Sequence, residues 1–535
     1  METKTCQNCK KDFVIDSEDF NFYEKMKVPP PTWCPECRLI RRMNWANERN
    51  LYRRKCSLCQ NEFLGMFSEA TSFPVYCHQC WWSDKWDATQ YALDYDPNMP
   101  FFDQYLKLRN SVPRAGVIRQ GFNKNSEYTN CESNNKNCFL LFSGNFNENC
   151  SYCYICNDSR DCFDCFGSQK NEKCWWCVNC FGCYNLKYSQ DCVACRDSWF
   201  LFGCRNSHDC FGCVNLVNRQ YCFMNKQLSK DEYQKSVTNF NFSEMRDKFD
   251  EMRTNCIVKD LSGSHNIESS GNWLYNCKNA KNCFMSRELE DAKNVFYVTQ
   301  GKDLLDVYAF GRGVENIYET ARVGYQSANL AFCINCYTAN NNLRYCDHCH
   351  SCSDLFGCVG MHKKQFCILN KQYSETEFNN LKEKIIAKMT VSHEYGEFFP
   401  IELSPFCFNE TPAQDFFPLT KEQAQAKGYR WRDHERRHYQ VGGNIVSCIH
   451  DQKCNHNCTG AFRVTPAELK FYKADNIPHP TLCPNCRHHA RLEMRIPPRL
   501  YSRTCAKCAT AIETSYAPDR LEIVYCKKCY QQEVY

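Results

Sequence analysis

The clearest pattern of apolar and polar positions lies mid-chain, where a stretch of thirty residues is followed by a copy of itself. Residues 161–190 and 191–220 align without a gap, and five cysteines of one copy coincide with five of the other. The matched pairs are Cys162/Cys192, Cys165/Cys195, Cys174/Cys204, Cys180/Cys210 and Cys183/Cys213. A fixed period of 20–50 residues is typical of stacked repeats that bury their apolar face against a neighbour. This tract therefore predicts a solenoid.

The cysteines inside the repeat stand three residues apart, as in Cys174, Cys177, Cys180 and Cys183. Side chains alternate between the two faces of a continuous strand, so residues three apart cannot share a face. They can point to the same side if the chain turns a corner between them, as in a parallel β-solenoid. The Asn, Asp and Gly residues beside these cysteines suit such corners, because they tolerate a left-handed backbone.

A second solenoid is indicated by a phrase that recurs downstream. Residues 222–232 and 367–377 share the order Cys, Asn-Lys-Gln, Ser and Glu. Ser229 with Glu232 is a capping box, as is Ser374 with Glu377, so we expect a helix to leave the last coil of each solenoid. The second solenoid uses Val, Ile and Leu where the first uses Cys. That exchange suggests that the cysteines of the first act as small apolar side chains.

Outside the repeats the pattern predicts three helices. One begins at Cys34-Pro-Glu-Cys37, a second is short and lies in the aromatic segment around residues 100–106, and a third runs from Leu419 to Tyr439. The predicted domains are 1–82, a pair of zinc modules; 83–127, a helical connector; 128–235, the first solenoid; 236–264, a linker; 265–390, the second solenoid; 391–447, a connector with the basic helix; and 448–535, a second pair of zinc modules.

Cysteine is the outlier of the composition, with 45 among 535 residues, near the level that signals a disulfide or metal scaffold. The first residues contain no apolar leader, and nowhere are there eighteen consecutive apolar residues, so we expect no membrane span. In a reducing, cytoplasmic setting thiolate–metal chemistry is favoured over disulfides. The net charge of +5 is small, so any affinity for nucleic acid must come from local basic patches.

Four CxxC pairs within residues 1–80, and a similar series at the other end of the chain, predict structural zinc sites. Two pairs complete one tetrahedral site with four cysteine ligands, and such a site has no open coordination position. The expected ligand sets are Cys6, Cys9, Cys34 and Cys37; Cys56, Cys59, Cys77 and Cys80; Cys454, Cys458, Cys483 and Cys486; and Cys505, Cys508, Cys526 and Cys529. An interleaved pairing stays open. We expect about four zinc ions per chain, with a structural role.

The two ends of the chain are duplicates of each other. Cys9 and Cys34 are 25 residues apart, as are Cys458 and Cys483, and the later intervals match as well. The two ends differ at one point, because the C-terminal end has the pair Cys454-x3-Cys458 where the N-terminal end has a CxxC pair. We therefore expect the first knuckle of the C-terminal modules to differ from the others.

The end modules resemble the bacterial "probable zinc-ribbon" (treble-clef-like) family. The resemblance rests on Cys6-x2-Cys9-x3-Phe13, an acidic residue before Phe22-Tyr23, and Cys34-Pro-x-Cys37-Arg38. Phrases in the centre of the chain look like the body of uncharacterised cysteine-rich bacterial proteins that carry such ribbons. The resemblance implies zinc binding, and it brings no catalytic residues.

Basic residues interleaved with aromatic ones follow the CPxC motifs, in a pattern suited to phosphate contact and base stacking. The candidates are Arg38, Arg41, Arg42, Arg49, Arg53 and Arg54 in the first modules, and Arg487, Arg491, Arg495, Arg499 and Arg503 in the last. The alternative is that these side chains are solvated or pack against the ribbon. Nucleic acid, RNA first, is the favoured partner, and protein is next; no small-molecule substrate is evident.

Two other functions compete with a binding scaffold. The trunk cysteines could form a metal or thiol reservoir, and His348, Cys349, His350 and Cys352 make a local group that could hold a metal. The segment 434–438 satisfies HExxH, the motif of zinc metalloproteases. Its two Arg residues and polar flanks favour coincidence. We therefore expect a non-catalytic, mainly β protein: a tandem parallel β-solenoid trunk flanked by paired zinc ribbons.

Overall fold

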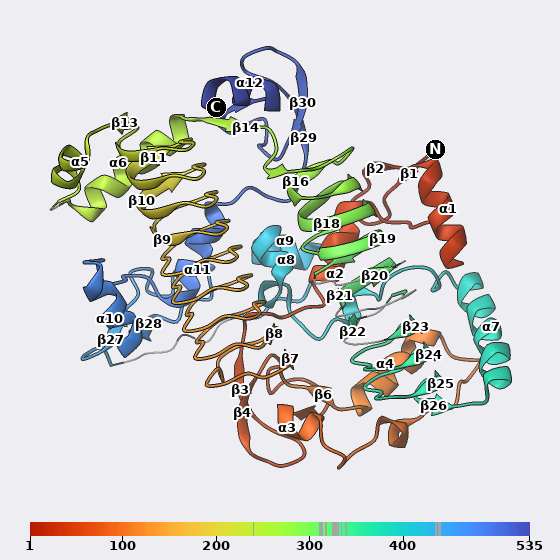
Figure 1. Cartoon of the computed structure of the whole chain (residues 1–535). Coiled ribbons are helices and arrows are strands. Elements are labelled where there is room, and N and C mark those ends of the chain that lie inside the picture. The colour runs from red at the N-terminus through yellow and green to blue at the C-terminus, as the bar shows by residue number, and fades with distance from the viewer. Residues whose placement is uncertain are drawn as a thin grey trace. The chain divides into compact units, whose positions relative to one another are not determined.

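The computed structural model describes the whole chain except residues 239, 310–313, 316–317, 324–330, 333, 337–339, 434–435 and 437–439. It divides into two compact units (Figure 1). Unit 1 comprises Met1–Val117 and Leu261–Arg432, and unit 2 comprises Ile118–Asp260 and Asp433–Tyr535. Each unit contains one solenoid and one pair of terminal modules. The N-terminal modules share a unit with the second solenoid, and the C-terminal modules share a unit with the first.

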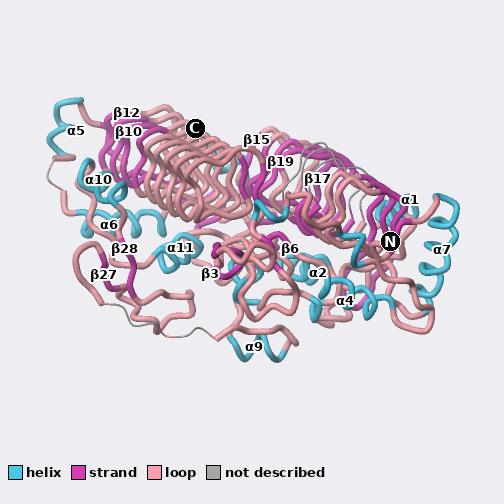
Figure 2. The backbone as a smooth tube through the Cα atoms, turned by 90° about the horizontal axis from the view of Figure 1, so that it is seen from below, coloured by secondary structure: helices cyan, strands magenta, loops and turns pink. Residues whose placement is uncertain are grey.

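The expected class is confirmed: the protein is mainly β, with a β-solenoid trunk. In unit 2 the coils pair in parallel with a shift of twelve residues, as Phe139 with Ser151 and Ser151 with Phe163. Figure 2 shows these coils stacked one on the next. From Asn134 to Asn185 every third residue has a positive φ. Each coil therefore has four sides of three residues, with a left-handed corner after each side, as the cysteine spacing predicted.

The thirty-residue sequence repeat is not the structural repeat. Thirty residues cover two and a half coils of twelve, so matched positions of the two copies lie on opposite sides of the coil. The three-residue side is the unit common to both periods. It keeps every matched cysteine facing inward, which is why the longer period could persist in the sequence.

Asparagine and aspartate at the corners hydrogen-bond from coil to coil. The side-chain amide of Asn125 donates to Asn137 Oδ1 at 3.0 Å, Asn137 to Asn149 Oδ1 at 3.0 Å, and Asn149 to Asp161 Oδ1 at 2.9 Å. A left-handed conformation costs an ordinary L-residue roughly 1–2 kcal/mol. Asn and Asp adopt it more readily, and here their ladders add contacts along the stack.

The interior of this solenoid is filled mainly by thiols. Its buried cluster combines Leu141, Leu186 and Leu201 with cysteines 138, 150, 153, 156, 162, 165, 174, 177, 180, 183, 192, 195, 204, 210, 213 and 222. The thiols lie near main-chain carbonyls of their own and the next coil; for Cys153 Sγ the distances are 3.4 Å to Ser151 O and 3.5 Å to Cys162 O. Within this core, cysteine acts as a small apolar side chain that also donates weak hydrogen bonds.

Longer strands form at the end of this solenoid. They are β9 (Tyr184–Lys187), β10 (Arg196–Phe202), β11 (His208–Val214) and β12 (Gln220–Phe223), all parallel, with β13 (Lys226–Gln227) antiparallel to β12. Helix α5 (Lys230–Ser236) begins at the predicted capping box: Ser229 Oγ accepts from the Glu232 amide, and Glu232 accepts from the Ser229 amide. Helix α6 (Phe242–Asn255) contacts β10 and β11. The first coils include β7 (Arg119–Gln120) and β8 (Glu132–Ser133).

The solenoid of unit 1 contains more regular strand and ends with the same device. Its elements are β15 (Gly263–Ser264), β16 (Gly271–Tyr275), β17 (Lys278–Lys281), β18 (Cys283–Lys293), β19 (Thr299–Tyr308), β20 (Val314–Glu315), β21 (Tyr318–Val323), β22 (Ile334–Cys336), β23 (Asn341–Arg344), β24 (Ser353–Phe356), β25 (Gln365–Ile368) and β26 (Lys371–Gln372). Helix α7 (Glu375–Val391) begins at the capping box of Ser374 and Glu377. Both capping-box predictions are confirmed.

The terminal modules are small and built on hairpins. Unit 1 has β1 (Glu2–Thr5), β2 (Asp12–Ile15), α1 (Ser17–Met26), α2 (Pro35–Met43), β3 (Tyr52–Lys55), β4 (Glu62–Gly65), β5 (Val75–Tyr76) and α3 (His78–Trp81). Unit 2 has β27 (Ile445–Ser447), β28 (Ala461–Arg463), α10 (Pro466–Ala474), α11 (Pro484–Glu493), β29 (Tyr501–Thr504), β30 (Ala511–Thr514), β31 (Ile523–Tyr525) and α12 (Lys527–Val534). In each unit a parallel strand extends the second module, β6 (Arg114–Ala115) beside β5 and β14 (Ile257–Lys259) beside β31.

The connectors of unit 1 confirm one helix and correct another. The aromatic segment forms η1 (Ala88–Tyr91) and the predicted helix, α4 (Phe101–Ser111). The later connector forms η2 (Ile401–Leu403), η3 (Phe408–Glu410), α8 (Pro412–Phe416) and α9 (Lys421–Ala426). The helix expected from Leu419 to Tyr439 is wrong, because α9 ends at Ala426, Gly428 has φ +78°, and residues 429–433 are not helical. No helix among the described residues is long and apolar enough to cross a membrane.

Candidate metal centres

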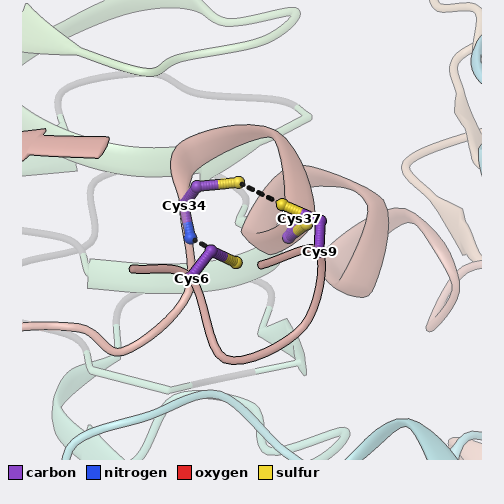
Figure 3. A group of neighbouring side chains, drawn as sticks. All are labelled: Cys6, Cys9, Cys34 and Cys37. Atoms are coloured by element: carbon purple, nitrogen blue, oxygen red, sulfur yellow. Dashed lines mark hydrogen bonds between the residues drawn. The ribbon is translucent and has the colours of Figure 1, made fainter. Parts of the chain in front are cut away.

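Each module brings four cysteines together from two local structures. In the first module Cys6 and Cys9 lie in the turn between β1 and β2, Cys34 is the N-cap of α2, and Cys37 lies in its first turn. Figure 3 shows the four side chains converging. Their sulfur atoms lie within 4.8 Å of one another, and Cys9 Sγ is 3.7 Å from Cys34 Sγ. This group could hold a metal ion.

The sulfur spacing fits one tetrahedral ion. With metal–sulfur bonds of about 2.3 Å, the edge of a tetrahedron of four sulfurs around zinc is about 3.8 Å. The distance is 3.9 Å between Cys59 and Cys77, and 3.8 Å between Cys508 and Cys526. Hydrogen bonds with Cys37 lower the pKa of the Cys34 thiol, and the same pairing raises the pKa of Cys37. A thiol that ionises readily at a helix N-terminus suits metal binding, which requires thiolate.

Two backbone hydrogen bonds recur in all four modules and fix which cysteine comes first. In module 1 the amide of Cys34 donates to Cys6 Sγ at 3.2 Å, and the amide of Cys6 donates to the carbonyl two residues after the second ligand. The equivalent amide–sulfur bonds are Cys77 to Cys56 at 3.3 Å, Cys483 to Cys448 at 3.3 Å and Cys526 to Cys505 at 3.2 Å. Cys448 is therefore the counterpart of Cys6.

This corrects one predicted ligand set. Cys448, Cys458, Cys483 and Cys486 form the group in the third module, in place of Cys454, Cys458, Cys483 and Cys486. The other three sets group as predicted, without interleaving. The x3 spacing of Cys454 and Cys458 resembled a knuckle, but Cys448 directly follows strand β27 (Ile445–Ser447), just as Cys6 follows β1. That position after a strand was the signal in the sequence.

The residue after the fourth cysteine of each module reaches the solenoid of the same unit. In the second module, Trp81 packs on His362 with ring centroids 5.2 Å apart. The other three contacts are Arg38 with Asp306 at 2.7 Å, Arg487 with Asp164 at 2.6 Å, and the Tyr530 hydroxyl with Asn215 Oδ1 at 2.9 Å. The helix turn that contains the last cysteine of the group thus also supplies a side chain that docks on the solenoid.

In unit 1 the arginines of α2 are buried in ion pairs with solenoid carboxylates. Arg38 lies 2.7 Å from Asp306, and Arg41 lies 2.7 Å from Glu319. Arg42 is fully buried, 3.7 Å from Asp306. Burial alone would lower the pKa of Arg38, but the charge of Asp306 raises it above its usual value. The pKa of Arg41 is raised in the same way by Glu319, whereas burial lowers that of Arg42, so the ion pairs favour the charged form of Arg38 and Arg41.

Unit 2 repeats the arrangement with different partners. Asp164, a corner residue of the solenoid with φ +54°, accepts from Arg487 Nη1 and Arg491 Nη1, each at 2.6 Å. Glu468 in α10 accepts from the same Arg487 at 2.8 Å and from the Tyr152 hydroxyl at 2.8 Å. Asp164 and Glu468 are both completely buried. The acidic side chains neutralise charges that the sequence had suggested were at the surface.

The predicted nucleic-acid contacts are accordingly wrong for seven of the eleven arginines. Arg38, Arg41, Arg42, Arg54, Arg487, Arg491 and Arg495 are buried, with exposed fractions of 7% or less. A side chain enclosed by its own protein cannot contact a phosphate. Arg53 is exposed, and Arg49, Arg499 and Arg503 are half-buried.

The remaining candidates from the sequence do not form a metal group within the described residues. No trunk cysteine belongs to a described cluster of three or more metal-ligating side chains. Cys349 and Cys352 face the interior, whereas His350 stands among the aromatic rings around Trp81 and Trp82. Of the HExxH segment, His434, Glu435 and His438 lie outside the described residues.

No protein-family model matches this chain, and no curated protein matches its sequence at a significant level. The resemblance of the modules to zinc ribbons therefore stays a prediction. Function has to be inferred from the geometry of the modules and their contacts.

Proposed function

We propose that this protein is a non-catalytic zinc-binding scaffold, in which zinc ions hold the terminal modules in the shape that docks onto the solenoids. The observation that carries this proposal is the recurrence of a four-cysteine group immediately before a docking residue in all four modules. Four thiolates occupy every position of a tetrahedral ion, so such an ion has a structural role.

Zinc is the metal that this donor set favours. Thiolates select Zn2+ over the harder divalent ions, and tetrahedral geometry with four sulfur ligands is typical of structural zinc. Each filled site would contribute folding free energy on the order of 10 kcal/mol, as in zinc-finger peptides. That is large beside the small hydrophobic core that one hairpin and a short helix can build. We expect removal of zinc to unfold the modules and to release their docking contacts.

Nucleic-acid binding is not part of this proposal, because most of the arginines that suggested it are buried in contacts within their own unit. A partner that recognised the assembled protein would have to use other surfaces. The hypothesis of RNA binding now depends on Arg49, Arg53, Arg499 and Arg503. Salt-dependent RNA binding by the full chain that is lost on replacing Arg53 and Arg503 by Glu would support it.

The experiment that tests the proposed function is elemental analysis with thiol titration on the full chain, purified anaerobically without added metal. We expect zinc in all four of the four-cysteine groups and free thiols in the trunk. Absence of zinc from the purified chain, with the fold intact, would refute the proposal. A metal content well beyond the five candidate groups would favour a metal or thiol reservoir instead.

The structure also gives an internal control for this measurement. Cys59→Ser removes an exposed ligand of the second module, whereas Cys407→Ser removes a half-buried cysteine that belongs to none of the candidate groups. We expect the first variant to bind one zinc ion fewer and the second to bind as much as the wild type. Equal zinc contents in the two variants would show that the four-cysteine groups do not hold the metal.

A further inference from the structure

The third module contains a loop that its three relatives lack, and this loop carries its own metal-binding side chains. Two residues separate the first and second ligands in the other modules, but nine separate Cys448 from Cys458. Within the inserted residues lie His450, Cys454 and His456. Together with Cys486 they form a second group whose donor atoms lie within 4.8 Å of one another.

Cys486 belongs to both groups. Its sulfur lies 3.7 Å from Cys454 Sγ, the edge length of a thiolate tetrahedron around one ion. It is also a member of the four-cysteine group of the module, in which Cys458 Sγ and Cys483 Sγ are 4.0 Å apart. A thiolate sulfur has more than one lone pair, so it can bind two metal ions at once.

Each histidine of the loop buries one ring nitrogen. The Nδ1 atoms of His450 and His456 are buried, and neither makes a hydrogen bond within the described part of the chain. The rings lie 5.7 Å apart, and His456 stacks on His489 of α11 with centroids 4.5 Å apart. A buried nitrogen without a hydrogen bond costs free energy unless another ligand satisfies it.

We propose that the third module binds two zinc ions that share the thiolate of Cys486. The first ion is held by Cys448, Cys458, Cys483 and Cys486, and the second by His450, Cys454, His456 and Cys486. This inference rests on the proposed zinc binding and extends it to a two-metal cluster.

Charge supports the second ion. A zinc ion with four thiolates carries a net charge of −2. Adding the second ion with Cys454 as thiolate and two neutral imidazoles gives five thiolates for two dications, which lowers the net charge to −1. The second ion would be the more exchangeable of the two, because it has fewer thiolates of its own and its loop ligands are only half-buried.

Zinc counting on the full chain separates this inference from the proposed function. We expect five zinc ions in the wild type and four in Cys454→Ser, with Cys407→Ser as the matched control that keeps five. Dialysis against a chelator should release one ion in five in a fast phase that Cys454→Ser lacks. Four ions in both the wild type and Cys454→Ser would overturn the inference and leave the four-cysteine sites intact; no zinc at all would overturn both.

A second variant controls for the possibility that Cys454→Ser loses zinc because the module unfolds. His450→Gln with His456→Gln keeps every cysteine and should bind four zinc ions; five would overturn the inference. The shared thiolate has its own signature in the cobalt-loaded chain. Two high-spin Co2+ ions joined through sulfur couple magnetically, so part of the electron paramagnetic resonance intensity should be missing and should return in Cys454→Ser. Full intensity in the wild type would exclude the bridge.

Discussion

Asp164 of the solenoid binds two arginines of the third module, and Asp164→Asn tests whether this contact holds the module in place. The carboxylate accepts hydrogen bonds from two buried guanidinium groups, Arg487 and Arg491, at 2.6 Å each. Asparagine has the same size and tolerates the left-handed corner, so the substitution removes charge and little else. Removing one partner of a buried ion pair costs about 3–5 kcal/mol. Arg487 keeps Glu468 at 2.8 Å, so we expect the lower end, about 3 kcal/mol.

The assay is hydrogen exchange of the peptide that covers α11 in the zinc-loaded full chain. A loss of about 3 kcal/mol in local stability corresponds to exchange roughly 100-fold faster in the slowest amides of this peptide. Asp158→Asn is the matched control, because Asp158 is an exposed corner residue of the same solenoid with φ +52°. It should change exchange by about twofold or less. If α11 exchanged at the wild-type rate in Asp164→Asn, the buried pair would not hold the module.

Three further results are expected. Cys177→Ala should leave the zinc content unchanged and destabilise the trunk by only about 1 kcal/mol, because the thiol is a buried filler; loss of metal would contradict this. Asn149 has φ +54°, so Asn149→Val should lower the free energy of unfolding by about 1–2 kcal/mol. Asn149→Gly should lower it less, and thermal or denaturant unfolding measures both. Burial lowers the pKa of His362 to about 4, so unit 1 should lose stability as pH falls from about 6.5 towards 4, and His362→Phe should flatten that loss.

The architecture of the trunk was predictable because its rule is local. Cysteines three apart require a corner between them, and Asn, Asp and Gly occupy the corners, so side length and interior could be read from one coil. The coil length was not predicted, because the thirty-residue copy is the more conspicuous period, and it shares with the twelve-residue coil only a factor of six, which is two sides. Pairing between coils joins residues twelve apart, and the series Cys150, Cys162 and Cys174 has that spacing in the sequence, where the thirty-residue copy obscures it.

The four-cysteine groups were predictable for a similar reason, and the one wrong assignment also arose from a local pattern. A CxxC turn and a helix N-cap are defined within a few residues, and three of the four sets follow from them. In the third module the inserted loop supplied a second plausible cysteine, Cys454, close to Cys458. The amide hydrogen bonds from Cys483 to Cys448 Sγ and from Cys448 to the Gly460 carbonyl identify Cys448 as the first cysteine of the group.

The role of the arginines could not be predicted, because their partners are remote in the sequence. Arg38 pairs with Asp306, and Arg487 with Asp164; nothing near either arginine indicates an acidic partner. An arginine that follows a zinc knuckle reads equally well as a phosphate contact or as one half of a buried pair. The choice depends on which solenoid the module packs against, and the N-terminal modules pack against the second one.

The pairing of each terminal module with the more distant solenoid decides which form of the protein is suitable for binding experiments. Both units are built from segments that the chain separates, since the modules at one end share a unit with the more distant solenoid. A fragment that contained only the N-terminal modules would expose Arg38, Arg41 and Arg42, which the complete unit neutralises with Asp306 and Glu319. Such a fragment would attract polyanions through charges that are not available in the whole protein. Binding partners must therefore be sought with the full chain, in which each module keeps its contacts with the solenoid of its unit.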